Sequence, residues 1–267
     1  MKNESPDLDI EVNALTVSYE EKSVLENVSL GIHRGQVTCI LGPSGCGKST
    51  LLKAMLGRLR PIGGRIRILG RDILNTEREE LSKFLVNVGV TFQHGALFGS
   101  QSVGENVAAP LHEHTDLDAE SIRMLVRVKL ALVGMEGAID RMPSQLSGGM
   151  QKRVAIARAL ALDPKILFFD EPSAGLDPIT ALALDDLILF LNRSLGCTIV
   201  VITHEIRSVL RISSRIVCLG EGKVLLSGTV HEFLTSPKPE IKAFLAASRA
   251  GADGTHPHDG VAAHGHA

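Results

Sequence analysis

Residues 42–49 read GPSGCGKS and match the pattern G-x-x-x-x-G-K-[ST] at every fixed position. The preceding run, Gln36–Leu41 (QVTCIL), is apolar and β-branched, which is typical of a buried strand. The following run, Thr50–Leu59 (TLLKAMLGRL), has apolar residues at helical spacing. The pattern therefore lies between a predicted strand and a predicted helix, which is the context that a phosphate-binding loop requires.

The residue types within this loop suit a polyphosphate with a cation. Gly42, Gly45 and Gly47 let the backbone curl so that its N–H groups point inward, and these groups form an anion site with the helix N-terminus. Lys48 is expected to reach the outer phosphates, and Ser49 to offer its hydroxyl to Mg²⁺. The alternative is a glycine-rich strand-to-helix turn that ends in Lys-Ser without a ligand.

A second feature of this kind follows further along the chain. Leu146–Met150 (LSGGM) precedes Gln151–Leu162 (QKRVAIARALAL), which has strong helical periodicity. Ser147 is a natural N-cap, and Gly148 and Gly149 leave the N–H groups of the first turn uncovered. Such a helix N-terminus can hold a γ-phosphate, whereas the alternative is an ordinary Ser-capped helix.

Together with further motifs, these stretches resemble the ATP-binding cassette (ABC) ATPases over residues 8–248. The signature departs from the family's LSGGQ, because Met150 takes the last place and Gln151 is displaced by one. The motifs occur in the family's order: Tyr19 as the aromatic A-loop, residues 42–49 as Walker A, Gln93 as the Q-loop, Leu146–Met150 as the signature, Ile166–Glu171 (ILFFDE) as Walker B with the catalytic glutamate, Ser173–Pro178 (SAGLDP) as the D-loop, and His204 as the switch histidine.

The resemblance implies a complete ATP site with ATP and Mg²⁺ as its ligands. It implies that Glu171 and His204 are catalytic and that Ser49, Gln93 and Asp170 lie around the metal. The residues that it implies for nucleotide binding are Tyr19, Gly42, Pro43, Ser44, Gly45, Cys46, Gly47, Lys48, Ser49, Thr50, Gln93, Ser147, Gly148, Gly149 and Asp177.

The carboxylates of this site have a physical reason as well. Ile166–Phe169 is a fully apolar run, as a central strand is, and it ends in Asp170 and Glu171. A strand end beside the phosphate loop puts Asp170 near the Mg²⁺ shell and lets Glu171 orient the attacking water. The alternative is a solvated strand end. His204, after the predicted strand Thr198–Thr203, is expected to sense the γ-phosphate, although a lone histidine there is more often structural.

Two other motif residues carry weaker signals. Gln93 ends the predicted strand Val88–Phe92, and a glutamine there can touch the metal shell, but alone it decides little. Tyr19 is the only tyrosine of the chain, and its alternative is a half-exposed aromatic residue of a strand.

Composition excludes several classes of protein. The 267 residues suit one large α/β domain, and a formal net charge of −2 without a basic block argues against a nucleic-acid surface. Cys39, Cys46, Cys197 and Cys218 form no C-x-x-C pair, so neither a disulfide framework nor a zinc site is expected. Cys46 lies among phosphate-binding N–H groups, so we hypothesise a lowered pKa and a reactive thiol, and the alternative is a small residue that simply fits the loop.

No stretch reaches eighteen apolar residues, and the acidic start MKNESPDLDIE lacks the apolar core of a signal peptide. We therefore expect a chain that neither spans a membrane nor is secreted. If it acts in transport, another subunit must supply the pore, and the chain then lies peripherally at the cytoplasmic face of the inner (plasma) membrane.

The pattern along the chain and the resemblance predict one fold class. It is α/β, a P-loop NTPase with a RecA-like core, an N-terminal antiparallel β subdomain built on residues 9–34, and a helical signature subdomain at about 94–162. Gly31 is expected to punctuate the first strands, and Val230–Ser248 to form one helix. The tail 249–267 is predicted to be flexible, and its histidines are expected to be disordered rather than metal ligands: 256, 258, 264 and 266.

One segment resembles a particular subfamily. His94–Asp116 (HGALFGSQSVGENVAAPLHEHTD), together with Met142–Gln145 and Glu171–Ile179, is similar to the ATPases of mammalian-cell-entry (MCE/Mla-type) lipid transport systems. This implies a homodimer that energises phospholipid transport with a multispanning permease and an MCE-domain lipid-binding protein. Leu97 and Phe98 are apolar in a Gly/Ser loop, which predicts a permease socket at Gly95–Asn106 unless buried packing explains them.

Other functions remain open at this point. The chain could serve another ABC importer or exporter, or it could be a cell-division-type ABC ATPase that energises a membrane partner without transport. A chromosome- or ribosome-acting ABC protein needs a long coiled coil or two tandem cassettes, and the sequence has neither. The transported lipid and the direction of transport stay open.

Overall fold

A computed structural model describes residues 7–20, 22–93 and 96–250 of the chain. Residues 251–267, which hold the four histidines of the predicted flexible tail, lie outside the described residues. His94, and Gly95 at the start of the predicted permease socket, also lie outside them.

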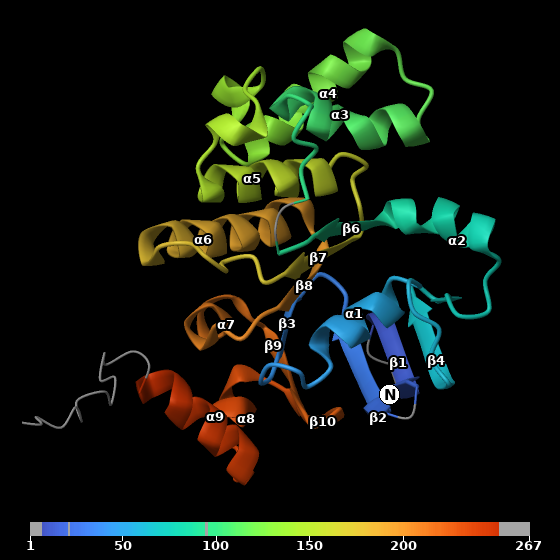
Figure 1. The fold of residues 1–267 in the computed structure, drawn as a ribbon, viewed down its shortest axis with the longest axis vertical. Coiled ribbons are helices and arrows are strands. Elements are labelled where there is room, and N and C mark those ends of the chain that lie inside the picture. Colours follow the sequence, from blue (N-terminus) through green and yellow to red (C-terminus); the bar gives the residue numbers. More distant parts are fainter. Residues whose placement is uncertain (1–6, 21, 94–95, 251–267) are drawn as a thin grey trace, which may run out of the picture.

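The centre of the molecule is a six-stranded sheet with the strand order β10-β9-β3-β8-β7-β6 (Figure 1). Neighbouring strands pair in parallel except β10 and β9, which are antiparallel. This confirms the mainly parallel sheet that the alternating strands and helices predict. The strands are β3 Val37–Leu41, β6 Val88–Thr91, β7 Ile166–Asp170, β8 Thr198–Ile202, β9 Arg215–Gly220 and β10 Lys223–Gly228.

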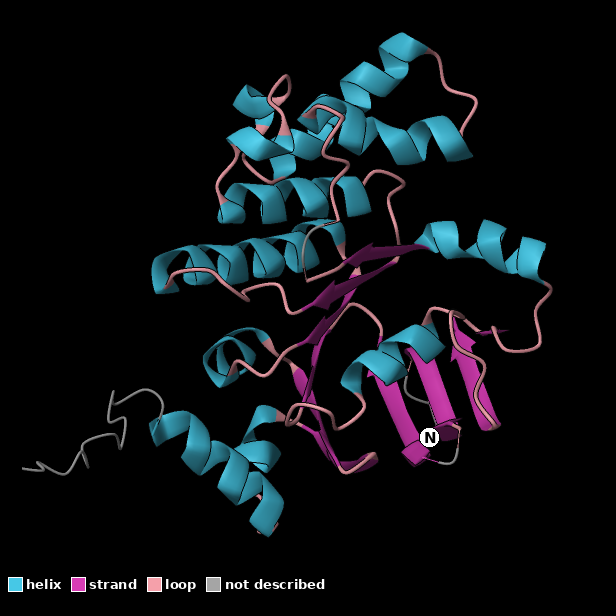
Figure 2. Cartoon of the chain, viewed as in Figure 1, coloured by secondary structure: helices cyan, strands magenta, loops and turns pink. Residues whose placement is uncertain are grey.

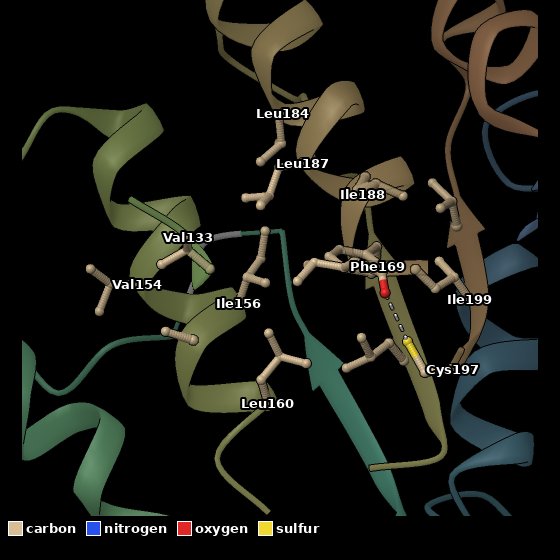
Figure 3. Packing of buried hydrophobic residues seen from close by; sticks show 14 of the residues in the cluster. Val133, Val154, Ile156, Leu160, Phe169, Leu184, Leu187, Ile188, Cys197 and Ile199 are labelled. Carbon is tan, nitrogen blue, oxygen red and sulfur yellow. Dashed lines mark hydrogen bonds between the residues drawn. The ribbon is translucent and has the colours of Figure 1, made fainter. Parts of the chain in front are cut away.

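The central strands are apolar throughout because helices cover both faces of the sheet. Along β7, Leu167 and Phe169 enter one core cluster, and the alternate residues Ile166 and Phe168 enter the other. Figure 3 shows Phe169 packed between side chains of two helices and of the neighbouring strand β8. All four side chains are fully buried, which explains the continuous apolar run in the sequence.

A second, antiparallel sheet has the order β2-β1-β4-β5 and packs beside the first helix, α1 (Figure 2). It confirms the predicted strands of residues 9–34, but Gly31 lies inside β2 instead of ending it. A Cβ atom at Gly31 would lie 2.8 Å from Leu8 Cδ1, so the glycine serves close packing between β1 and β2. The elements are β1 Leu8–Tyr19, β2 Lys22–His33, β4 Gly63–Ile68, β5 Arg71–Asp72 and α1 Lys48–Met55.

A buried carboxylate joins the two sheets. Asp9 of β1 is only 3% exposed, and it accepts a hydrogen bond of 2.5 Å from the Thr198 hydroxyl at the start of β8. Its other oxygen accepts from Arg34 Nε at 2.9 Å. A buried charge is tolerated when it is paired and hydrogen-bonded in this way.

Three of the remaining helices lie together at one end of the molecule (Figure 1). The helices α3, α4 and α5 pack against one another at one end of the molecule, and residues 101–162, all of which the structure describes, contain no strand, as predicted. The helices are α2 Arg78–Phe84, α3 Val103–His114, α4 Ala119–Leu132, α5 Gly148–Ala159, α6 Pro178–Leu195, α7 Ile206–Ile212, α8 Val230–Leu234 and α9 Pro239–Ala250, with short 3₁₀ helices η1 Leu85–Asn87, η2 Glu136–Ala138 and η3 Pro143–Gln145.

Two predicted helices differ from those observed. The predicted helix Val230–Ser248 is wrong as a single element: α8 and α9 are separate, because Pro237 disfavours a helical conformation at the residue before it. The helix after the phosphate loop ends at Met55 rather than Leu59, because Gly57 takes the left-handed conformation with φ +65° and stops it.

We expect Gly89→Ala to destabilise the fold. Gly89 lies in β6, and a Cβ atom there would lie 2.5 Å from the carbonyl oxygen of Ala159 and 2.6 Å from Leu167 Cδ2. The backbone must shift to make room for the added methyl group, and this should lower the free energy of unfolding, measured by urea denaturation, by about 1–3 kcal/mol. The control is Gly137→Ala, whose Cβ atom meets nothing within 4 Å and should change stability by less than about 0.5 kcal/mol. Equal stability of the two variants would contradict this account of the sheet–helix contact.

Candidate nucleotide-binding site

The phosphate loop connects β3 to α1 at the carboxyl edge of the central sheet. Two glycines allow it to lie close to its neighbours. At Gly42 (φ +155°) a Cβ atom would lie 2.3 Å from the carbonyl oxygen of Leu219 in β9. At Gly47 (φ +106°) it would lie 2.5 Å from Leu25 Cδ2 in β2. The backbone of the loop therefore has its position because no side chain is present at these two residues.

The helix α1 begins at Lys48, two residues earlier than the sequence predicts. Its N-cap is Gly47, which supplies no side-chain cap, and its first turn contains no acidic residue. The N–H groups of this first turn have no carbonyl partner within the helix. Together with the helix dipole, they make the loop a site for an anion. Pro43, Ser44, Gly45 and Ser49 are exposed and Thr50 is half-buried.

Lys48 lies beneath the loop with its side chain only 9% exposed. Its ammonium group donates hydrogen bonds to the carbonyl oxygens of Gly42 at 2.8 Å and Pro43 at 3.0 Å. No carboxylate among the described residues lies within ion-pair distance of it. In the described part of the chain the ammonium is therefore held by backbone carbonyl oxygens and by no ion pair, so a negatively charged ligand in the loop would meet its positive charge.

The two carboxylates at the end of β7 differ in their surroundings. Burial raises the pKa of Asp170, and the neighbouring charge of Glu171 raises it further. The cations Lys152, Lys48 and Lys53 act on the same pKa in the opposite direction. The influence of Lys48 links the end of β7 electrostatically to the phosphate loop.

Glu171 is held in a defined position. Its backbone has φ +48°, and its N–H group donates to the carbonyl oxygen of Ile202 at 2.8 Å. One carboxylate oxygen lies 3.0 Å from Nδ1 of His204, and the other accepts from the Thr203 hydroxyl at 3.3 Å. The structure thus brings together Glu171 and His204, two residues that the sequence singled out. Thr203 was missed, although it directly precedes the predicted histidine.

Lys152 was also missed by the sequence analysis. It lies on α5, and its ammonium group donates to the carbonyl oxygen of Gln93 and, at 3.5 Å, to that of Glu171. Burial lowers its pKa, while Asp170 and Glu171 raise it. A cation of α5 therefore joins the segment after β6 to the end of β7. The side chain of Gln93 itself is exposed.

The predicted second phosphate-binding feature does not reach the first one within the chain. The α5 residues Val154 and Ile156 pack in the core cluster on one face of the central sheet, and the α1 residues Leu51 and Met55 pack in the cluster on the other face. Figure 1 shows the two helices on opposite sides of that sheet. Ser147, the N-cap of α5, is consequently separated from the phosphate loop.

The residues around Ser147 have clear local roles. Its hydroxyl accepts from the N–H group of Met150 at 3.3 Å, which confirms the predicted cap. A Cβ atom at Gly149 would lie 2.5 Å from Thr180 Cγ2, so this glycine lets α5 approach α6. Asp177 caps α6 and accepts from Ile179 and Thr180 N–H groups at 3.0 Å each. Hydrogen bonds from Thr180 lower the pKa of its carboxyl group.

Tyr19 lies at the end of β1 and is 44% exposed. It pairs with Lys22 at the start of β2, and Val24 and Leu25 of the same strand lie against Gly47. The hairpin that carries the tyrosine thus adjoins the phosphate loop.

The prediction of a lowered pKa for Cys46 is wrong. Its side chain is buried, and desolvation raises the pKa of the thiol, although Lys48 acts to lower it. Burial also raises the pKa of Cys197 to about 11 and of Cys218 to about 12. The thiol packs beneath Gly42, where a Cβ atom would lie 2.7 Å from its sulfur atom.

The predicted permease socket is only partly exposed. Phe98 is 51% exposed and lies under the guanidinium of Arg158, 5.5 Å from its ring centre. Leu97, expected to be exposed, is half-buried and packs against the core. Asn106, which is fully buried, exchanges hydrogen bonds with the backbone of Phe98 at 2.8 and 3.1 Å and so holds the loop.

Phe98 also lines a groove of about 490 Å³ between the edge of the central sheet at β6 and the helices α3 and α5. Its walls come from residues of η1 and β6 on one side and of α3 and α5 on the other. We call it the Phe98 groove. Its lining includes Leu85, Val90, Pro110 and Leu162.

Fold and site together define a P-loop nucleoside triphosphatase. The sequence profile of the ABC transporter family matches residues 25–174, and the chain belongs to this family. Family membership makes it an ATPase, that is, an ATP-binding and ATP-hydrolysing subunit that works with a membrane permease. None of the described helices combines the length and apolar character that a bilayer-spanning segment needs.

Two curated relatives cover most of the chain. It is 43% identical over 242 residues to the probable ribonucleotide transport ATP-binding protein mkl of Mycobacterium tuberculosis. The matched region covers 91% of this chain and 67% of that protein. It is 42% identical over 236 residues to the intermembrane phospholipid transport system ATP-binding protein MlaF of Haemophilus influenzae, which covers 88% and 89%.

Solved structures agree with the fold. The dimeric ATP-binding cassette MJ0796, in a post-hydrolysis state bound to ADP and Pi, superposes with a TM-score of 0.76 at 33% identity over 83% of this chain and 98% of that one. CbiO1 from Clostridium perfringens, part of the ABC transporter complex cbiONQ, gives a TM-score of 0.80 at 33% identity over 92% and 98%. The predicted fold class is confirmed.

We expect Cys46 to be alkylated slowly, with a rate that is still rising at high pH. The thiolate is the reacting species, so the rate levels off only when the pH exceeds the pKa of the thiol. Because this pKa is raised above the ordinary cysteine value of 9.0, the plateau should lie above pH 9. Iodoacetamide labelling of the native chain from pH 7 to pH 10, read by mass spectrometry of the Cys46 peptide, measures this profile. The unfolded chain is the control and should react faster throughout. A plateau below pH 8 in the native chain would restore the reactive-thiol hypothesis.

Proposed function

We propose that this chain energises the transport of phospholipid, or of a related lipid, by an MCE/Mla-type membrane complex. The main support is the resemblance of the segment 94–116 to MCE/Mla-type ATPases. This segment directly follows Gln93, which Lys152 of α5 connects to the ATP site. The name of the MlaF relative supports the same cargo. The name of the mkl relative gives ribonucleotides as the second candidate.

In this proposal residues 8–248 form the ATPase domain, with the helical subdomain at about 94–162 inserted in it. The chain lies peripherally at the cytoplasmic face of the inner membrane. Its partners are a second copy of itself, a multispanning permease, and an MCE-domain protein that binds the lipid.

The phosphate loop holds the nucleotide. The N–H groups of the first turn of α1 and the ammonium of Lys48 bind the phosphates, and Tyr19 stacks on the adenine. Ser49, Asp170 and Gln93 would hold Mg²⁺, which neutralises phosphate charge when bound. A hydroxyl, a carboxylate and an amide oxygen are suitable ligands for this ion. The raised pKa of Asp170 fits such a role, since a cation beside it relieves the cost of its buried charge.

Glu171 orients the attacking water. Its carboxylate is fixed from both sides, by Nδ1 of His204 at 3.0 Å and by the Thr203 hydroxyl at 3.3 Å. A fixed carboxylate at this position polarises a water molecule in line with the γ-phosphate, and positioning is the main contribution to phosphoryl transfer. His204 senses the same phosphate through its exposed ring.

A second copy of the chain completes the site. Ser147 with Gly148 and Gly149 presents a helix N-terminus that lies across the central sheet from the chain's own phosphate loop. A two-fold dimer lets each copy supply this terminus, and Asp177, to the other copy's nucleotide. The dimeric state of the MJ0796 cassette supports this arrangement.

The permease docks in the Phe98 groove. A half-exposed aromatic ring on a loop that Asn106 fixes is a suitable anchor for an apolar helix. The groove lies on the segment that follows Gln93, so changes at the nucleotide can pass to the permease along one short stretch of chain.

We expect Glu171→Gln to keep ATP binding and to reduce hydrolysis about 100-fold or more, because an amide cannot take up charge from the attacking water. ATPase rates of the full complex and nucleotide affinities measure the two effects. Glu205→Gln is the matched control, since Glu205 is an exposed acid next to His204, and it should hydrolyse ATP normally. Hydrolysis by Glu171→Gln at the wild-type rate would refute the assignment.

We expect Phe98→Asp to weaken retention of the permease by roughly tenfold or more while ATP-dependent thermal stabilisation persists. The apolar contact is lost and a carboxylate is desolvated in its place. Val128→Asp on α4, where the side chain is 50% exposed, is the control and should keep the permease. Lipid co-purified with the wild-type complex distinguishes the two cargoes, and a complex without any membrane protein would end the transport proposal.

A further inference from the structure

A second groove lies on the other side of η1 from the Phe98 groove. It has a volume of about 830 Å³ and lies between the end of α1 and the start of α2. Leucine side chains at 59, 74, 81 and 85 line it. Ser82 and Leu85 belong to the walls of both grooves, so the two form one continuous surface. We call it the arginine groove.

The charge of this groove is unbalanced. Arg58, Arg60 and Arg78 lie along it, and Glu77 is the acidic residue among its lining. The three arginines are exposed, and in the described part of the chain none of them has an ion-pair partner. Neighbouring cations do have partners: Arg71 pairs with Glu80 at 2.6 Å, and Lys83 with Glu79 at 2.8 Å. The cations that surround the groove are therefore neutralised by ion pairs, whereas the three arginines that line it are not.

We propose that the arginine groove binds a cytoplasmic segment of the permease that carries carboxylate side chains. The inference rests on the proposed function. Guanidinium groups bind carboxylates through paired, parallel hydrogen bonds, and the leucines between them suit the apolar side chains of the same segment. The phosphate of an anionic lipid would also suit the arginines. The continuity with the Phe98 groove favours the permease, because one protein segment can occupy both.

This contact adjoins the ATP site. The guanidinium of Arg58 lies 5.2 Å from the centre of the Phe92 ring, and Phe92 directly precedes Gln93. The carbonyl oxygen of Gln93 accepts the hydrogen bond from Lys152 of α5. A carboxylate that draws Arg58 away from the ring thus acts one residue from Gln93, which Lys152 joins to Glu171 at the end of β7. The arginine groove would then contribute to coupling as well as to affinity.

The first test reverses charge without touching Arg58. In the complex purified from membranes, Arg60→Glu with Arg78→Glu should lower the affinity for the permease by about tenfold at moderate salt and flatten its salt dependence. The matched control is Arg123→Glu with Arg127→Glu, two exposed positions of α4 with the same change in charge. The permease is identified as the multispanning protein that co-purifies with the wild-type chain.

The second test identifies the carboxylates. Arg60→Lys and Arg78→Lys keep the positive charge and supply a primary amine, so a carbodiimide can join each to an Asp or Glu side chain in direct contact. Mass spectrometry of the cross-linked complex should give new links from these positions to one permease segment, and none from Arg123→Lys. Replacing the linked acid by lysine should then restore binding to the Arg60→Glu, Arg78→Glu chain.

The outcomes separate this inference from the proposed function. If Phe98→Asp loses the permease while the arginine variants keep full affinity and form no links, the inference is overturned and the proposed function stands. Vesicles with about one-third phosphatidylglycerol test the lipid alternative without permease. Flotation of the wild type with these vesicles, lost in Arg60→Glu, Arg78→Glu, would assign the groove to anionic lipid instead. If even Phe98→Asp retains the permease, the Phe98 groove is not its docking site, whereas a wild-type complex without any membrane protein would end the proposed function itself.

Discussion

The register of three parallel strands determines where the groups of the site lie. Ile202 of β8 pairs on one side with Ile40 of β3 and on the other with Asp170 of β7. The chain leaves all three strands at this level, into the phosphate loop, into Glu171 and into Thr203. Parallel strands end at a common edge, so a single alignment brings together groups that are far apart in sequence. A shift of one residue in β7 would exchange its two core faces and carry Asp170 away from Lys48.

The phosphate loop, the buried strands and the helix cap could be predicted because each depends on neighbouring residues in the sequence. The loop pattern at 42–49 requires a buried strand before it and a helix after it, and the structure has both. The apolar runs of β7 and β8 are continuous because both faces are buried, and such runs can be recognised without knowing their partners. Ser147 was recognised as a cap for the same reason, since capping depends on its own helix.

The missed features depend on contacts between distant segments. Lys152 follows the signature as one polar residue among several, and only the packing of α5 brings it to Gln93. Asn106 lies near the start of α3, and its side chain reaches the loop at Phe98 only after folding. Cys46 was misjudged because the sequence shows its neighbours but not the direction of its side chain, which packs inward beneath Gly42. Burial is a tertiary property, and it outweighs the nearby donors in setting the pKa of that thiol.

The charges of the site favour the bound state of the protein over the free one. The raised pKa of Asp170 means that the folded chain holds this proton to a higher pH than the unfolded chain does, so ionising it costs stability as pH rises. A cation beside the carboxylate reverses that effect. The ammonium of Lys48, which donates hydrogen bonds to backbone carbonyl oxygens, would meet the phosphate oxygens of the same ligand. The buried carboxylate alone is a cost to the fold, and a magnesium nucleotide would compensate it. Stabilisation by this ligand should therefore grow as pH rises through the pKa of Asp170, because protons and the cation compete for the same oxygen atoms.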